Sequence, residues 1–102
     1  MITEKQIAEY LNRFGFKRSL LGYKYMISAI NIAIQDPYAI EQVTKILYPA
    51  IAKMYNTTSS RAERAMRHSI ETCYTYANMY AKKMTNSEFI ATAVYYFKYK
   101  EK

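Results

Sequence analysis

Residues 47–71 read LYPAIAKMYNTTSSRAERAMRHSIE, and this stretch decides the fold that we expect. Pro49 lacks an N–H and would clash with the preceding turn in a helix interior, but it is tolerated in a first turn. We therefore expect a short helix over about residues 48–55. The polar residues 56–60 belong to types that favour turns and helix caps, so they predict a turn. A longer helix is expected over about residues 60–80.

The start of the longer helix has three candidate capping residues. Ser60 followed by Glu63 fits a capping box, in which each side chain bonds the backbone N–H of the other residue. Thr58 or Ser59 would also serve as the N-cap, since their hydroxyls accept bonds from the first exposed amides of a helix. The sequence leaves this choice open.

The longer helix has two unlike faces when its residues are placed 100° apart. One arc carries side chains that we expect to pack on the core: Ala62, Ala65, Met66, Ser69, Ile70, Cys73 and Ala77. The opposite arc carries side chains that we expect to face outward: Arg61, Arg64, Arg67, His68 and Glu71. Glu63 lies at the border. A short helix, a polar turn and a longer helix with a basic outer face indicate a helix-turn-helix over about residues 48–80.

A basic outer face of this kind suits the reading of DNA. A helix fits the major groove, where the planar fork of arginine matches guanine and glutamate accepts a bond from the cytosine amino group. We therefore expect Arg64 and Arg67, together with Glu63, to contact bases. The residues that we expect to hold the DNA backbone are Lys53, Thr57, Thr58, Ser59 and Arg61. The alternative is a merely solvated face, in which Glu63 and Arg67 form an i,i+4 ion pair.

The N-terminal part of the chain predicts two further helices. Thr3 and Gln6 fit a capping box that opens a helix to about Arg13, and Gly15 is placed to end it. A second helix is expected over about residues 20–35, because apolar residues recur there at intervals of three and four. This buried stripe contains Tyr23, Met26, Ile27, Ile30, Ala33 and Ile34.

Two more helices complete the expected fold. The pair Asp36-Pro37 should stop the second helix, since the residue before a proline avoids the helical region. A third helix is expected over residues 39–47, with its inward positions at Ile40, Val43 and Leu47. Thr85 with Glu88 should cap a last helix over residues 86–97. The chain therefore predicts a compact all-α bundle of about six helices, in one domain over residues 1–102.

The composition favours an anionic partner. The net charge is +7, from 15 Lys and Arg against 8 Asp and Glu. Such an excess favours nucleic acid or a membrane surface, although it also serves solubility. No apolar run approaches the roughly 20 residues needed to span a bilayer, and residues 1–11 lack the pattern of a signal peptide. We therefore expect no membrane partner and a cytoplasmic location.

The sequence offers little support for catalysis or metal binding. His68 is the sole histidine, and Cys73 does not share its face well, so we expect no metal site. Cys73 itself should be a small buried hydrophobe, without a nearby base to activate it. No phosphate-binding loop, dinucleotide fingerprint or Ser/His/Asp set is present. We expect no enzyme activity, no cofactor and no small-molecule substrate.

Several short motifs match a known family. They are Leu47-Tyr48-Pro49, Ile51-Ala52-Lys53, Tyr55-Asn56-Thr57-Thr58, Ser60-Arg61, Glu63-Arg64-Ala65 and Arg67-His68, and near the C-terminus Thr85-Asn86-Ser87-Glu88-Phe89-Ile90-Ala91. The chain resembles, over about residues 20–97, the DNA-binding effector domain of the master response regulator of sporulation in endospore-forming bacteria. The resemblance implies an all-α domain that binds double-stranded DNA at boxes similar to TGTCGAA, often in tandem.

The resemblance also implies residue roles. The implied base contacts fall on Glu63, Arg64 and Arg67, and the implied support of backbone contact on Ser60, Arg61 and His68. Because the family's domains pair head-to-tail on tandem boxes, aromatic residues near the C-terminus are candidates for a homodimer contact on DNA. These residues, which exceed what a small core needs, are Tyr95, Tyr96, Phe97 and Tyr99.

Two departures from the family alter what we expect of regulation. Full-length members carry an N-terminal receiver domain with a phosphorylated aspartate, whereas Met1 here opens the effector domain directly. Residues 72–84 form a shorter segment than in the family, whose members use a helix and loop there to contact the polymerase sigma subunit. We therefore expect a bacterial, nucleoid-associated binder without a receiver, which occupies its boxes as a repressor or competitor rather than as a sigma-contacting activator.

An alternative of another class is a protein-interaction module. Such a module would bind a full-length sporulation regulator and have little DNA binding of its own. Lys82 and Lys83 are candidates either for phosphate contact or for a solvated pair.

Overall fold

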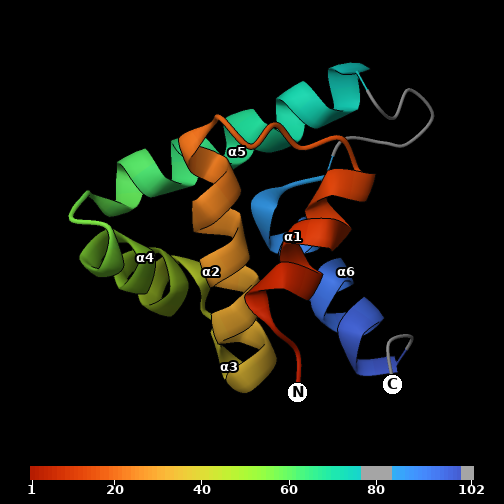
Figure 1. Ribbon diagram of the computed structural model, residues 1–102. Helices are drawn as coiled ribbons and strands as arrows, with labels where there is room; N and C mark the ends of the chain where they lie inside the picture. The colour runs from red at the N-terminus through yellow and green to blue at the C-terminus, as the bar shows by residue number, and fades with distance from the viewer. Residues whose placement is uncertain (77–83, 100–102) are drawn as a thin grey trace.

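The computed structural model describes residues 1–76 and 84–99, which form helices joined by short connections (Figure 1). The helices are α1 Glu4–Arg13, α2 Leu21–Gln35, α3 Tyr38–Glu41, the π-helical turn η1 Val43–Leu47, α4 Tyr48–Met54, α5 Ser59–Tyr76 and α6 Asn86–Tyr99. No strand occurs in these two ranges, which confirms the expected all-α class. None of the helices described is both long and apolar enough to cross a membrane.

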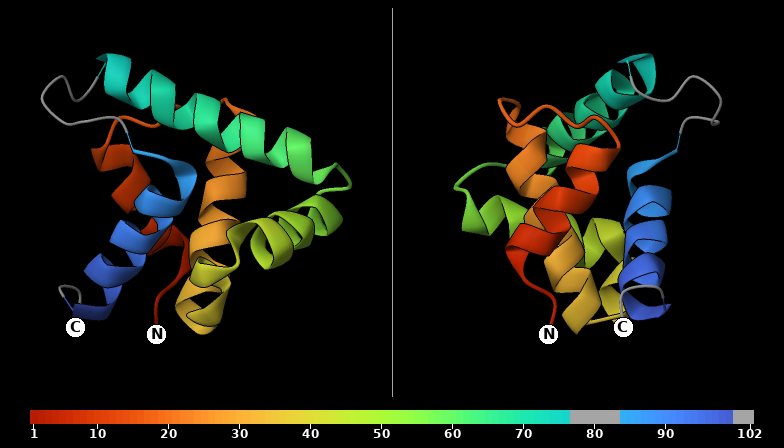
Figure 2. Two further views of the ribbon diagram at one scale, coloured as in Figure 1. Left: turned by 180° about the vertical axis from the view of Figure 1, so that it is seen from behind. Right: turned by 45° about the vertical axis from the view of Figure 1, so that its right-hand side comes forward.

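Helix α2 is the central element of the bundle. Figures 1 and 2 show α4 on one side of α2 and the pair α1 and α6 on the other, with α5 lying across one end of all of them. Contacts join α2 to α1, α4, α5 and α6. The helix-turn-helix is thus held on a scaffold made by the remaining helices.

The predicted capping boxes at α1 and α6 are confirmed. The Thr3 hydroxyl accepts from the Gln6 N–H at 3.2 Å, and the Thr3 N–H donates to the Gln6 side chain at 2.8 Å. The corresponding distances for Thr85 and Glu88 are 3.1 and 2.9 Å. Gly15 follows α1 with φ of 88°, a value that glycine adopts without strain.

The buried face of α2 differs from the predicted stripe. Met26, Ile30 and Ala33 are fully buried as expected, but Tyr23, Ile27 and Ile34 are only partly buried. The buried positions that the stripe missed are Gly22, Tyr25, Ser28 and Ala29. The physical reason is that neighbours pack against α2 from several directions, so its buried arc is wider than the single stripe of a surface helix.

The prediction of one continuous helix over residues 39–47 is wrong, because the structure has two short helices there. The chain breaks at Gln42, with φ of −127° and ψ of 48°, and separates α3 from η1. The Leu47 N–H reaches the Gln42 carbonyl five residues back at 3.4 Å, which is the π-helical pattern. Pro49 cannot donate the next helical bond, so a widened turn precedes α4. Val43 and Leu47 are buried as predicted, whereas Ile40 is only partly buried.

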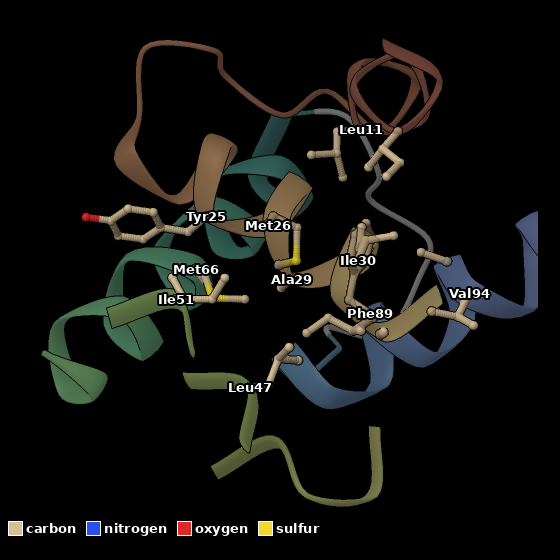
Figure 3. Packing of buried hydrophobic residues seen from close by; sticks show 14 of the residues in the cluster. Leu11, Tyr25, Met26, Ala29, Ile30, Leu47, Ile51, Met66, Phe89 and Val94 are labelled. Atoms are coloured by element: carbon tan, nitrogen blue, oxygen red, sulfur yellow. The ribbon is translucent and has the colours of Figure 1, made fainter. Parts of the chain in front are cut away.

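The core lies around the middle of α2. Figure 3 shows Met26, Ala29 and Ile30 of α2 between side chains contributed by the other helices. Those neighbours include Leu11 from α1, Leu47 from η1, Ile51 from α4, Met66 from α5 and both Phe89 and Val94 from α6. Burial of these side chains supplies the main favourable term in folding.

The aromatic residues of α6 divide between the core and the surface. Phe97 is buried, and the Tyr96 ring packs 4.8 Å from that of Tyr10 in α1. The expectation that all four C-terminal aromatics exceed the needs of the core is therefore wrong for this pair. Tyr95 and Tyr99 are exposed.

Cys73 lies on the inner face of α5, as predicted. Its side chain is buried, and its thiol donates to the Phe14 carbonyl. Burial raises the pKa of the thiol to about 11, because the charged thiolate loses its hydration. At neutral pH the group is a protonated, inert part of the core.

Helices α2 and α5 approach each other closely at Gly22. A Cβ at this position would overlap with the Ser69 hydroxyl and with the backbone carbonyl of Ala65. Since the carbonyl belongs to the α5 backbone, it cannot move aside as a flexible side chain would. The absence of a side chain at Gly22 therefore sets the distance between the two helices.

Substitution Gly22→Ala should lower the free energy of unfolding by at least about 1–3 kcal/mol, the usual cost of overpacking. This loss would run against intrinsic helix propensity, which favours alanine over glycine by about 1 kcal/mol. Urea denaturation followed by circular dichroism measures the change. The matched control is Leu21→Ala at the exposed neighbouring position, which should have a much smaller effect. An unchanged or raised midpoint for Gly22→Ala would contradict the close crossing.

Candidate nucleic-acid interface

A tight turn joins α4 to α5. The Tyr55 N–H donates to the Ile51 carbonyl at 3.0 Å, and the Thr57 N–H donates to the Ala52 carbonyl at 2.9 Å. Between them Asn56 has φ of 53°, in the left-handed region. This 6→1 bond with a left-handed residue inside it is a Schellman motif, and asparagine tolerates the position better than most residues. The motif ends α4 and reverses the chain at once.

Thr58 caps the start of α5. Its hydroxyl accepts from the Arg61 N–H at 3.1 Å, and its carbonyl accepts from the Ala62 N–H at 2.9 Å. Helix α5 begins at Ser59, so Ser60 lies inside the first turn and the predicted capping box between Ser60 and Glu63 is wrong. The reason is the Schellman turn, which brings the chain into helical geometry before Ser60 is reached. Of the three candidates, the structure selects Thr58.

The turn is anchored to α2 through Tyr55. Its hydroxyl lies 2.6 Å from the Ser28 hydroxyl, and its ring centroid lies 4.9 Å from that of Tyr25. The Lys24 ammonium lies 5.4 Å from the centre of the same ring. Sequence reasoning missed this anchor, since no local pattern links residues so far apart in the chain.

The two faces of α5 are largely those predicted. The buried residues of the inner face are Ala62, Met66, Ser69, Ile70 and Cys73, while Ala65 is partly buried. Ala77, also assigned to this face, lies outside the described residues. The exposed residues of the outer face are Arg61, Arg64, Arg67 and His68, and Glu71 is partly buried. Four basic or ionisable side chains therefore project from consecutive turns of one helix.

Glu63 and Arg67 form an ion pair on the outer face. The Arg67 Nε lies 3.5 Å from a Glu63 carboxylate oxygen, with side-chain exposures of 51% and 34%. This is the i,i+4 pair expected from the solvated alternative. Pairs of this kind stabilise a helix by only about 0.3–0.5 kcal/mol. The pair therefore orients the two side chains at little cost to any partner that separates them.

A hollow lies beside the first turns of α5. Its volume is about 340 Å³, and it is lined by Thr44, Tyr48, Ser59, Ser60, Glu63, Arg64 and Arg67. It brings together all three predicted base-reading residues and two of the predicted backbone contacts. The other predicted contacts, which do not line this hollow, are Lys53, Thr57, Thr58, Arg61 and His68. Lys53 is exposed in the last turn of α4, and the Thr58 hydroxyl keeps a proton to donate while it accepts the capping bond.

A second hollow adjoins the first on the side of α6. Its volume is about 350 Å³, and it is lined by Tyr48, Glu63, Arg67, Met84, Thr85, Asn86 and Ser87. Sequence reasoning missed the residues that α6 and α4 contribute to this surface, above all Tyr48 and Asn86. The capping box at Thr85 was a signal for the start of α6 but not for its position beside α5.

Within residues 1–76 and 84–99, no group of three His, Cys, Asp or Glu side chains is placed to share a metal ion. Lys82 and Lys83 lie outside the described residues. The exposed surface of α5 is therefore the feature that requires a functional explanation.

The tight turn and the basic outer face of α5 define a helix-turn-helix DNA-binding domain. The family model described as sporulation initiation factor Spo0A C terminal matches residues 7–97. The chain therefore belongs to this family, whose members are DNA-binding domains of sporulation regulators. The resemblance seen in the motifs of residues 47–68 is confirmed.

Substitution Thr58→Ala should lower the free energy of unfolding by about 1 kcal/mol, the typical cost of losing an N-cap. Ser60→Ala is the matched control, because Ser60 is exposed inside the first turn and should leave stability nearly unchanged. Both are measured by urea denaturation. Equal losses for the two variants, or a larger loss for Ser60→Ala, would mean that α5 begins later than Ser59.

Proposed function

We propose that this chain is a transcriptional regulator that reads double-stranded DNA in a sequence-specific manner, at tandem boxes similar to TGTCGAA. The observation that carries the proposal is the outer face of α5, where Arg61, Arg64, Arg67 and His68 are all exposed directly after a tight turn. The opposite face of the same helix is buried in the core. The helix is thus held rigidly with its basic side available to the major groove.

The proposed base contacts come from three residues that line one hollow. Arg64 and Arg67 would each bond guanine through O6 and N7, because the guanidinium fork matches that pair of acceptors. Glu63 would accept from a cytosine amino group. Its ion pair with Arg67 keeps both side chains on the same side of α5 before DNA arrives.

The proposed backbone contacts surround these three residues. They are Lys53, Thr57, Thr58, Ser59, Ser60, Arg61 and His68. Hydroxyls and the exposed amides at the start of α5 donate bonds to phosphate oxygens, and the helix dipole favours an anion there. Lys53, in the last turn of α4, adds a positive charge on the other side of the turn.

The direction of regulation remains a prediction. The segment that differs from the activating members of the family covers residues 72–84, and most of it lies outside the described residues. We propose that the chain occupies its boxes without activating through the sigma subunit. This part of the proposal is independent of the base and backbone contacts on α5.

Loss of a proposed base contact and loss of a proposed phosphate contact should affect DNA binding differently. Arg64→Ala should weaken binding to the box by about 1–3 kcal/mol and relax specificity at one base pair. Lys53→Ala should weaken binding to box and scrambled duplexes alike and reduce the salt slope by about 1, since one phosphate contact is lost. Fluorescence anisotropy with both duplexes, over a range of salt concentrations, measures these changes.

Binding of the unaltered chain is the control for both variants. Tight binding to the box together with weak binding to the scrambled duplex supports sequence reading. Equal, salt-sensitive binding to both duplexes would reject it, and the protein-interaction module would then be the better account. If the Arg64→Ala variant keeps the specificity of the unaltered chain, Arg64 does not contact a base.

We also propose self-association on tandem boxes through the exposed end of α6. Tyr95 and Tyr99 are exposed, with ring centroids 4.8 Å apart. Tyr95 also lines an apolar hollow of about 380 Å³ between α1 and α6, together with Tyr10, Arg13, Phe14, Thr92 and Tyr96. Exposed aromatic rings beside an apolar hollow are typical of protein contacts.

Combined substitution of Tyr95→Ser and Tyr99→Ser should abolish cooperative binding to a two-box duplex, because the apolar contact between copies is lost. Affinity for a single box should stay unchanged, since neither residue is near α5. Anisotropy with one-box and two-box duplexes gives both quantities. Cooperativity that survives the double substitution would rule out this surface.

A further inference from the structure

Asn86, the first residue of α6, lies in the interior against the helix-turn-helix. Its side chain is 5% exposed. Its amide nitrogen donates to the Glu63 backbone carbonyl at 3.1 Å and to the Tyr48 hydroxyl at 3.0 Å. One amide group is therefore bonded to the first residue of α4 and to the second turn of α5, which carries the proposed base contacts.

The geometry of the amide group makes this pair of bonds sensitive to the distance between α4 and α5. The two N–H bonds of a side-chain amide point in fixed directions, so each partner must lie along one of them. Since one partner belongs to α4 and the other to α5, both bonds are made only at one separation of these helices. The carbonyl bonded is that of Glu63, itself one of the three residues proposed to contact bases.

The Tyr48 hydroxyl is suited to accept the Asn86 bond. Burial raises the pKa of this phenol, while the bond from Asn86 and the charge of Arg67 act in the opposite direction and Glu63 raises it further. At neutral pH the hydroxyl is therefore protonated and neutral. It accepts from Asn86 and keeps its own proton to donate.

The asparagine at position 86 indicates that this buried site requires hydrogen-bond donors. The Asn86 carbonyl oxygen is buried and has no hydrogen-bond partner among the described residues. A buried polar atom without a partner is costly, so an apolar residue would suit a purely packing role better. What the site uses is the pair of N–H donors.

We propose that Asn86 is a positioning residue for DNA reading, which acts by fixing α5 relative to α4 through the Glu63 carbonyl and the Tyr48 hydroxyl. The inference rests on the proposed function, since it concerns the helix that would read the box. Contacts to base edges require placement to within about 0.5 Å. A side chain that sets the separation of the two helices therefore controls discrimination between sequences more than overall attraction to DNA.

Two substitutions remove the hydrogen bonds of Asn86 in different ways. Tyr48→Phe removes one acceptor and keeps the ring, and Asn86→Leu removes both donors while keeping a branched side chain with the same number of heavy atoms. Tyr48→Phe should weaken binding to the box roughly three- to tenfold, the factor that corresponds to one ordinary hydrogen bond, and Asn86→Leu, which removes two bonds, should weaken it by at least as much. Binding to a scrambled duplex should change less than twofold, because phosphate contacts tolerate small shifts. The ratio of the two affinities should fall accordingly.

Ile7→Val in α1 is the control for a general loss of stability. It trims a fully buried side chain and should lower the urea midpoint without touching α4 or α5. All variants are compared by anisotropy at one salt concentration and at a temperature where each is folded. The affinity ratio should be unchanged in Ile7→Val and reduced in Tyr48→Phe, even where the two have lost similar stability.

The double variant separates positioning from direct contact. If the Tyr48 hydroxyl acts through Asn86, Tyr48→Phe should have no further effect in the Asn86→Leu background. A full additional loss would mean that Tyr48 contacts DNA itself, which would overturn the inference. An unchanged ratio in both single variants would also overturn it while leaving the proposed function intact. A lack of discrimination in the unaltered chain would reject the proposed function, and the inference with it.

Discussion

The close crossing of α2 and α5 at Gly22 is the constraint on which the rest of the structure depends. Because no side chain separates the two backbones, α5 lies directly across the end of α2, and its inner face reaches the core through Met66 and Ile70. A wider separation would open a gap beneath α5 that the core has no side chains to fill. The position of Arg64 and its neighbours on the outer face of α5 follows from this packing.

The turn between α4 and α5 adds the second constraint. Its backbone is set locally by Asn56 and Thr58, and its position in the molecule is set by Tyr55, which bonds Ser28 of α2. The turn and α5 are therefore both attached to the same central helix. These contacts set the position of α5, and with it that of the basic face, relative to α2.

Local rules account for much of what the sequence predicts correctly. The capping boxes at Thr3 and Thr85 need only residues three apart, and the periodicity of α5 needs only its own residues. The predictions that were wrong have two kinds of cause. Some features depend on residues far apart in the chain, and others depend on a choice between residues that are equally suitable locally. Thr58 and Ser60 are both good caps, and only the left-handed backbone at Asn56 decides between them. The break at Gln42 was likewise not predicted, and it separates α3 from the π-helical turn that leads into α4.

The charges of the candidate interface could be predicted from the sequence, but the buried contacts that position it could not. Four exposed basic or ionisable side chains on α5 follow from helical spacing, whereas the contacts of Asn86 join residues 23 and 38 positions apart. Charge alone attracts any DNA, and its effect fades as salt increases. The proposed discrimination between sequences needs Arg64 and Arg67 at defined distances from base edges, which charge alone does not supply. Under the proposed function, the reading of a sequence would therefore depend on the buried, uncharged bonds beneath α5 as much as on the arginines that project from it.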